Sequence, residues 1–148
     1  MILRTCSEII SLAKKLESDS ANFYEGLAII DLEDAGVFTA FARENRRNIT
    51  TIERVYYGVI TDAIEGGFAF NIEADQFQLL NTLPEKVASE EALSQAVEIE
   101  NTMKQFYVTS AEQSKILMAD VPRMFLLMAR KRTDRISSLQ SLIKSKEG

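Results

Sequence analysis

The sequence predicts an all-α protein: a four-helix bundle made of two helical hairpins joined by a long crossover that contains a short helix. Three observations lead to this fold class. A helical pattern occurs twice along the chain, only two prolines and six glycines interrupt 148 residues, and a hydrophobic content of 46% suffices for one core. We therefore expect residues 1–148 to form a single domain.

The repeated pattern consists of an alanine, a glutamate four residues later, and a Phe-Tyr pair six and seven residues after the glutamate. A second helical stretch, opened by a phenylalanine and an alanine, follows each copy. The first copy is Ala13, Glu17, Phe23 and Tyr24 with Phe38 and Ala42, and the second is Ala96, Glu100, Phe106 and Tyr107 with Phe125 and Ala129. This repetition indicates two hairpins of the same design.

The first hairpin is expected to consist of a helix over roughly residues 3–30, a short polar connection from Asp31 to Gly36, and a helix over roughly residues 37–65. Gly66 and Gly67 should end the second of these helices.

The crossover and the second hairpin follow. A short helix is expected around Asn71 to Leu80, then Pro84 and a helix cap at Ser89. The third helix should span about residues 90–118, and Asp120 with Pro122 should open a fourth over about residues 121–144. One long crossover between two hairpins is the ferritin-like topology. The crossover carries apolar side chains that should cover the bundle, or else meet a second copy: Phe68, Phe70, Phe77, Leu79 and Leu80.

Alternating spacings of three and four residues define a core-facing stripe on each helix. Each stripe is apolar at both ends and polar in the middle. The stripes are Ile10, Ala13, Glu17, Ser20, Tyr24 and Leu27; Phe38, Phe41, Asn45, Asn48, Ile52, Val55 and Val59; Leu93, Ala96, Glu100, Met103 and Tyr107; and Phe125, Met128, Arg132, Arg135, Leu139 and Leu142. We expect one interior layer made of Glu17, Asn45, Asn48, Glu100, Arg132 and Arg135, flanked by Tyr24 and Tyr107.

With these residues the chain resembles the rubrerythrin branch of the ferritin-like superfamily over nearly its whole length. The resemblance implies a diiron centre held by one glutamate from each of two helices and an ExxH pair from each of the other two. Glu17 and Glu100 match the lone glutamates. The ExxH positions hold Asn45 and Asn48 in the first half and Arg132 and Arg135 in the second, so the metal signature fails at four of six positions.

Charge also argues against a metal in this layer. Two carboxylates and two guanidinium groups are already neutral together, and arginine offers no lone pair to a metal. We therefore expect no metal and no cofactor, with the glutamates paired to the arginines. Three alternative interpretations of these residues remain open. The asparagines could tolerate a wet layer, an arginine could extend to solvent, or a slipped register could assemble another metal site from Glu44, Glu53, Glu98 or Asp134.

The favoured function is a non-catalytic structural or interaction module with no catalytic residues. The alternative is a residual diiron-type oxidoreductase, a peroxidase or ferroxidase, that uses a carboxylate-only metal site. A third possibility is a small-molecule binder that holds an anion at Arg132 and Arg135 if the glutamates leave these side chains unpaired.

Composition narrows the partners and the compartment. A net charge of −5 disfavours nucleic acid and anionic membranes. The N-terminal stretch carries charges that interrupt any signal peptide or membrane span. Because Cys6 is the only cysteine, no internal disulfide can form, and a reduced, cytoplasmic setting fits. The expected partner is a second copy of the chain, most simply in a dimer, as the family resemblance implies.

Overall fold

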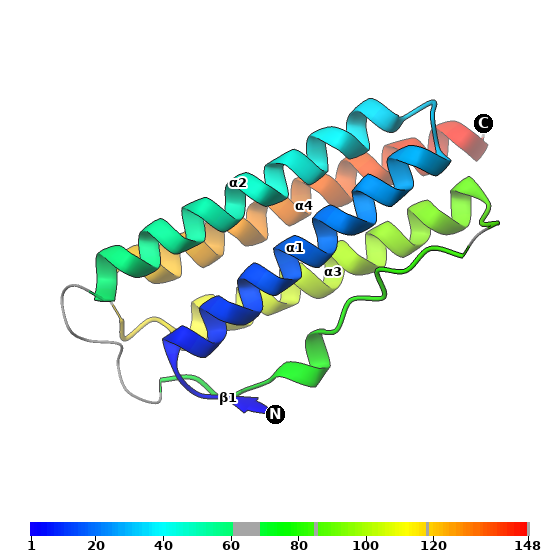
Figure 1. Ribbon diagram of the computed structural model, residues 1–148. Helices are drawn as coiled ribbons and strands as arrows, with labels where there is room; N and C mark the ends of the chain where they lie inside the picture. The colour runs from blue at the N-terminus through cyan, green and yellow to red at the C-terminus, as the bar shows by residue number, and fades with distance from the viewer. Residues whose placement is uncertain (61–68, 85, 118, 148) are drawn as a thin grey trace.

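The protein is all-α, with four long helices packed in pairs (Figure 1). The computed structural model describes residues 1–60, 69–84, 86–117 and 119–147. The helices are α1 (Cys6–Ile30), α2 (Ala35–Ile60), α3 (Ser89–Gln113) and α4 (Asp120–Glu147). Contacts are dense within the α1–α2 and α3–α4 hairpins, and each hairpin also touches the other through α1 with α3 and α2 with α4.

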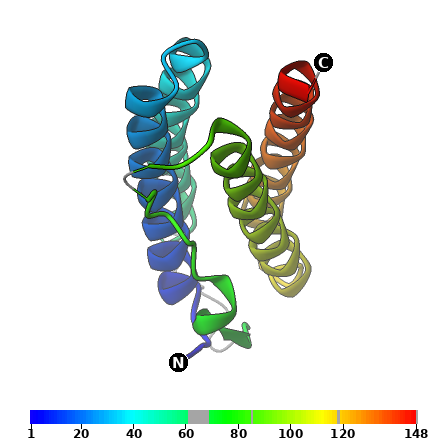
Figure 2. The ribbon, with the colours of Figure 1, turned by 90° about the vertical axis from the view of Figure 1, so that its right-hand side faces the viewer.

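After the first hairpin the chain runs back along the length of the bundle before it enters the second hairpin. In Figure 1, α2 ends at the same end of the bundle at which α1 begins, and the green segment after it runs back to the start of α3 at the opposite end. As a result α2 and α3 run in the same direction, and α1 runs with α4. The two termini lie at opposite ends of the bundle, as the turned view in Figure 2 also shows.

Local sequence explains how α1 begins. Thr5 is the N-cap: its side chain accepts a hydrogen bond from the Glu8 backbone N–H (3.2 Å), and the Glu8 carboxylate accepts one from the Thr5 backbone N–H (3.0 Å). This capping box satisfies two of the N–H groups that the first turn of a helix leaves unpaired. The predicted helix over roughly residues 3–30 therefore begins three residues later, at Cys6.

Strand pairing ties the N-terminus to the crossover. β1 (Ile2–Leu3) pairs antiparallel with β2 (Ile72–Glu73), and the Met1 amino group lies 2.6 Å from the Glu73 carboxylate. A 3₁₀-helix, η1 (Ala74–Phe77), follows β2. The short helix predicted around Asn71 to Leu80 is therefore wrong in extent. Pairing with β1, which is distant in sequence, holds its first residues extended.

The rest of the crossover lies over α1 and α3. Phe70 and Phe77 are buried, and the Phe77 ring packs edge-on against Phe106 of α3 at 5.5 Å. The Gln95 side-chain amide donates to the Leu80 carbonyl at 2.6 Å, although the Leu80 side chain itself is exposed. The expected covering role thus holds for the two phenylalanines and for Leu79, which is partly buried against the core, but not for Leu80, while Phe68 lies outside the described residues.

Other predicted boundaries shift by a few residues. α2 begins at Ala35, inside the predicted connection, and its predicted end at Gly66 and Gly67 lies outside the described residues. α3 begins at Ser89 with Ala88 as the N-cap and no side-chain cap bond, so the predicted cap at Ser89 is wrong. α3 ends at Gln113, before the predicted end near residue 118, and α4 spans Asp120–Glu147.

Hydropathy patterning places the core on the stripes. Both ends of the bundle are filled by aliphatic and aromatic side chains that are fully or nearly fully buried, including Leu27, Phe38, Phe125, Ile52 and Leu139. Phe41, Val55 and Leu142 are partly buried and pack against this core, and the Val59 side chain lies outside the described part. In the described residues, no helix is long and apolar enough to cross a membrane.

Candidate functional site

A layer of polar side chains crosses the middle of the bundle. All four helices contribute, and every one of the six side chains predicted for this layer is at most 3% exposed. They are Glu17 of α1, Asn45 and Asn48 of α2, Glu100 of α3, and Arg132 and Arg135 of α4. The structure thus brings together all six residues. We call these residues the polar layer.

Arg132 joins the two glutamates. Its Nη2 atom lies 2.5 Å from both carboxylate oxygens of Glu17, and its Nη1 atom lies 3.3 and 3.2 Å from the two oxygens of Glu100. Burial alone would lower the pKa of Arg132, but the two carboxylates outweigh burial and raise this pKa above its usual value. The centre of the bundle therefore holds a permanent cation between two acids.

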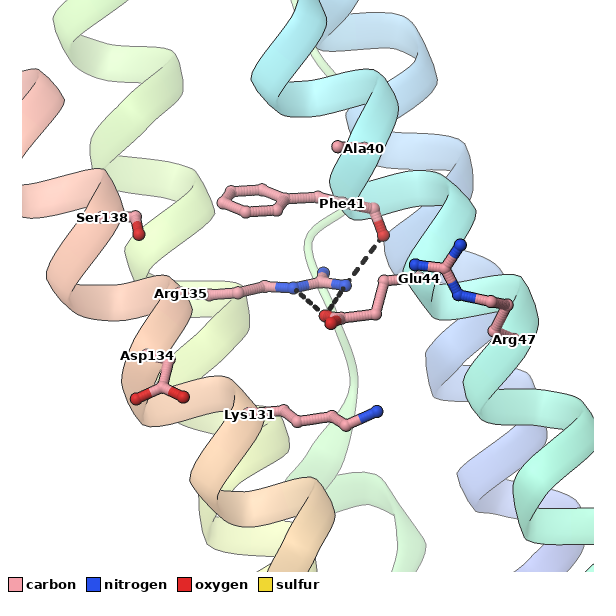
Figure 3. A pocket seen from close by; sticks show the side chains of 8 residues that line it. All are labelled: Ala40, Phe41, Glu44, Arg47, Lys131, Asp134, Arg135 and Ser138. Carbon is pink, nitrogen blue, oxygen red and sulfur yellow. Dashed lines mark hydrogen bonds and ion pairs between the residues drawn. The ribbon is translucent and has the colours of Figure 1, made fainter.

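Arg135 connects the polar layer to the protein surface. Its Nη1 atom donates to Asn45 Oδ1 (3.0 Å) and to Glu100 Oε1 (3.4 Å). Its Nε and Nη2 atoms point the other way, to one oxygen of Glu44 at 3.2 and 2.8 Å (Figure 3). The guanidinium carbon also lies 4.7 Å from the centre of the Phe41 ring, a cation–π distance. This side chain is therefore fixed on both of its faces.

The two asparagines hold Glu17 from the side of α2. The side-chain amides of Asn45 and Asn48 each donate to Glu17 Oε1 at 2.9 Å. Their carbonyl oxygens accept from other groups, since Ser20 Oγ donates to Asn45 and Lys131 Nζ donates to Asn48. Hydrogen bonding on both ends of each amide fixes the orientation of these side chains, so the asparagines are part of the network and do not simply tolerate water.

The two tyrosines bond across the hairpins. Tyr24 of the first hairpin donates its hydroxyl to Glu100 Oε1 of the second at 2.8 Å, and Tyr107 of the second donates to Glu17 Oε2 of the first at 2.6 Å. Burial, then the neighbouring glutamate, raises the pKa of each tyrosine well above its ordinary value. Both hydroxyls therefore stay protonated hydrogen-bond donors.

Two charged residues at the edge of this network, Glu44 and Lys131, were not predicted to belong to it, and Glu44 was considered only for the alternative metal site. Each precedes a stripe residue by one position, and each contacts the layer, Glu44 through Arg135 and Lys131 through Asn48. With them the site contains three acidic and three basic groups. Burial raises the pKa of Glu44, but the hydrogen bond and charge of Arg135 more than offset this, so the pKa is lowered overall. The mainly basic segments at positions 43–47 and 130–135, which contain these two residues, were the available signal.

The donor set does not fit a pair of metal ions. Both glutamates of the polar layer face the guanidinium of Arg132, which carries positive charge and no free lone pair. Across the described residues, no group of three or more His, Cys, Asp or Glu side chains is arranged to hold a metal ion. The alternative metal site is therefore not assembled either: Glu44 pairs with Arg135, and Glu53 lies 3.8 Å from Lys14.

Two other sequence-based alternatives also fail on geometry. Neither arginine extends to solvent, since Arg132 is fully buried and Arg135 is 3% exposed. The condition for holding an anion inside the layer is not met, because the glutamates occupy both guanidinium groups. One polar side-chain atom of the layer, Arg132 Nε, has no hydrogen-bond partner among the described residues.

Comparison of the chain with protein-family models, with curated proteins and with solved structures gave no significant match.

Proposed function

We propose that this chain is a ferritin-like bundle of the rubrerythrin type in which the polar layer has replaced the diiron centre, and that it acts as a non-catalytic structural or interaction module. Support for the ferritin-like assignment comes from two hairpins joined by a returning crossover and from Glu17 and Glu100, which lie at matching places in the two hairpins.

The observation that carries the proposal is the position of Arg132. In a diiron bundle the lone glutamates face the metal ions, whereas here Glu17 and Glu100 both face one guanidinium group at hydrogen-bond distance. A metal ion placed there would meet the positive charge of the Arg132 guanidinium. The pKa of this group is raised, so it stays protonated near neutral pH. The interior is complete in charge and largely complete in hydrogen bonds.

A buried ion cluster suits a structural role better than a source of stability. Removing charges from water is costly, so such clusters seldom add net stability over an apolar core, although they can specify which helices meet and in what register. Glu17 of α1 is by itself hydrogen-bonded to each of the other three helices, through Asn45 of α2, Tyr107 of α3 and Arg132 of α4. In this proposal the layer sets helix register, the partner is a second copy of the chain, and the compartment is the reducing cytoplasm.

The test is metal content. We expect protein purified without chelators to contain no stoichiometric iron or manganese by elemental analysis, and its thermal unfolding to be unchanged by added ferrous iron. The matched control is the variant N45E/N48H/R132E/R135H, which restores both ExxH pairs and should take up iron. Two tightly bound metal ions in the unaltered protein would favour the residual oxidoreductase and would overturn the proposal.

A further inference from the structure

The two sides of the bundle differ in charge. α2 and α4 lie side by side, and so do α1 and α3, which the crossover covers. Leaving out the four charged residues of the polar layer, α2 and α4 carry nine basic and five acidic residues, while α1 and α3 carry three basic and seven acidic residues. A chain with a net charge of −5 thus presents a basic α2–α4 face, which attracts anions.

A hollow of about 280 Å³ opens on this basic face. It could hold several waters or a small solute, since one water takes up about 30 Å³ in the liquid. Its lining residues come from α2 and α4 and are shown in Figure 3: Ala40, Phe41, Glu44, Arg47, Lys131, Asp134, Arg135 and Ser138. We call this feature the α2–α4 hollow.

In the α2–α4 hollow the carboxylate of Glu44 is paired with the guanidinium of Arg135, which is held in a fixed position. Nε and Nη2 of Arg135 both donate to the same oxygen of Glu44, so the guanidinium edge that could grip two oxygens of an anion grips only one. Arg135 is fixed by the Phe41 ring and by the Phe41 carbonyl, 2.8 Å from Nη2, so the edge is preorganised. The Glu44 side chain is 32% exposed and has room to turn outward.

Two further cations stand beside Glu44. In Figure 3 the side chain of Arg47 comes from α2 and that of Lys131 from α4, and their heads lie on different sides of the Glu44 carboxylate, while the one other acidic residue of the lining, Asp134, stays on the α4 side. Lys131 Nζ donates to Asn48 Oδ1, which leaves further N–H groups of this ammonium to donate to a ligand. Three basic residues therefore surround one weakly enclosed carboxylate.

We propose that the α2–α4 hollow is a binding site for a small oxyanion, a carboxylate or phosphate group, which takes the place of Glu44 against Arg135 and is also held by Arg47 and Lys131. This site is separate from the interior, where the glutamates occupy the guanidinium groups. Because Arg135 also donates to Asn45 and Glu100, an anion in the hollow is linked to the polar layer through one side chain.

The test is titration with sodium phosphate and with sodium acetate, followed by calorimetry and thermal unfolding, at an ionic strength held constant with sodium chloride. The two titrations distinguish the phosphate and carboxylate classes. We expect saturable binding of at least one anion to the unaltered protein. Glu44→Gln should bind that anion about tenfold more tightly, since it removes the competing carboxylate and keeps an oxygen for Arg135.

Matched controls separate the hollow from general attraction to the basic face. Arg47→Gln and Lys131→Gln should each weaken binding about tenfold. Arg43→Gln and Arg130→Gln remove the same charge from the same two helices outside the hollow, and should change affinity less than about twofold. Absence of saturable binding in both the unaltered protein and Glu44→Gln, or equal losses in the two pairs of variants, would overturn the proposal. None of these outcomes depends on metal content.

Discussion

The two hairpins share one framework and differ in the charge that each brings to the centre. The framework consists of a glutamate and a tyrosine on the first helix of each hairpin and an aromatic ring of the second helix that packs against the tyrosine. The ring centres of Tyr24 and Phe38 are 6.3 Å apart, and those of Tyr107 and Phe125 are 6.2 Å apart. On the second helix, however, Asn45 and Asn48 of α2 stand where Arg132 and Arg135 stand on α4.

Helix packing and charge balance are therefore controlled by different residues. The two neutral amides of α2 bond Glu17, whereas the two cations of α4 bond both Glu17 and Glu100. The packing requires the repeated framework in both hairpins. The charge requires only that the sum over the polar layer be zero, so one helix can supply every cation. The largest effects should therefore follow from removing charge, and smaller ones from removing neutral groups.

The strongest test compares Arg132 with its counterpart Asn45. Arg132→Met leaves the buried Glu17 without a cation and Glu100 with Arg135 alone, and should lower the free energy of unfolding by about 3–5 kcal/mol. Asn45→Leu removes no charge, only the hydrogen bonds that a neutral amide makes with Glu17 and Arg135, and should cost about 1–3 kcal/mol. Urea unfolding at neutral pH measures both. The triple variant E17Q/E100Q/R132M should recover part of the loss. Equal costs for the two single variants would show that charge balance is not the controlling quantity.

The crossed tyrosines predict a loss of stability in alkali. Their pKa values are raised in the folded protein, so above about pH 10 the unfolded chain releases these protons while the folded one keeps them. The stability that the two tyrosines contribute is present below the pKa of a tyrosine in the unfolded chain. It is lost as pH rises from that pKa toward the raised pKa of the folded protein. Above about pH 10, each tyrosine should lower the free energy of unfolding by about 1.4 kcal/mol per pH unit, so the two together should lower it by about 3 kcal/mol near pH 11.

Urea unfolding between about pH 8 and 11, with phenolate absorbance, measures this loss. The variant Y24F/Y107F keeps both rings and should show a shallower decline, because it no longer carries the two shifted groups. An equally steep decline in this variant would assign the alkaline sensitivity to other residues.

The smallest expected effect concerns the turns of the two hairpins. In the first, Lys146 Nζ lies 3.5 Å from Asp31 and 3.1 Å from Asp34. In the second, the buried Ser114 hydroxyl donates to the Ala111 carbonyl at 3.1 Å. Lys146→Gln should cost at most about 1 kcal/mol, and less in high salt, because the lysine lies near the surface. Ser114→Ala should show no salt dependence. A salt-independent loss in Lys146→Gln would contradict the assignment.

The stripes predicted the centre of the molecule better than its edges. Glu17, Glu100, Arg132 and Arg135 lie in the middle of stripes whose two ends are apolar, and burial of those ends determines where the charged side chains lie. The contact of Glu44 with Arg135 was not predicted, because it depends on how α2 and α4 are rotated against each other, which periodicity within one helix does not specify.

The crossover was predicted less well for a different reason. Residues Ile72 and Glu73 are extended because they pair with Ile2 and Leu3, about seventy positions earlier in the chain. Local propensity carries no information about such a distant partner. The boundary of α3 at Ser89 shows a related limit, since Glu90 and Glu91 in the first turn favour the helix start without a side-chain cap.

The crossed tyrosine bonds also bear on how copies of the chain could assemble. Each hairpin buries a glutamate whose tyrosine partner belongs to the other hairpin, so neither half is self-sufficient. Nothing in these bonds requires the complementary half to come from the same polypeptide. If the crossover opened, two chains could exchange hairpins and rebuild both interiors unchanged, giving an intertwined pair whose buried contacts are those of the monomer.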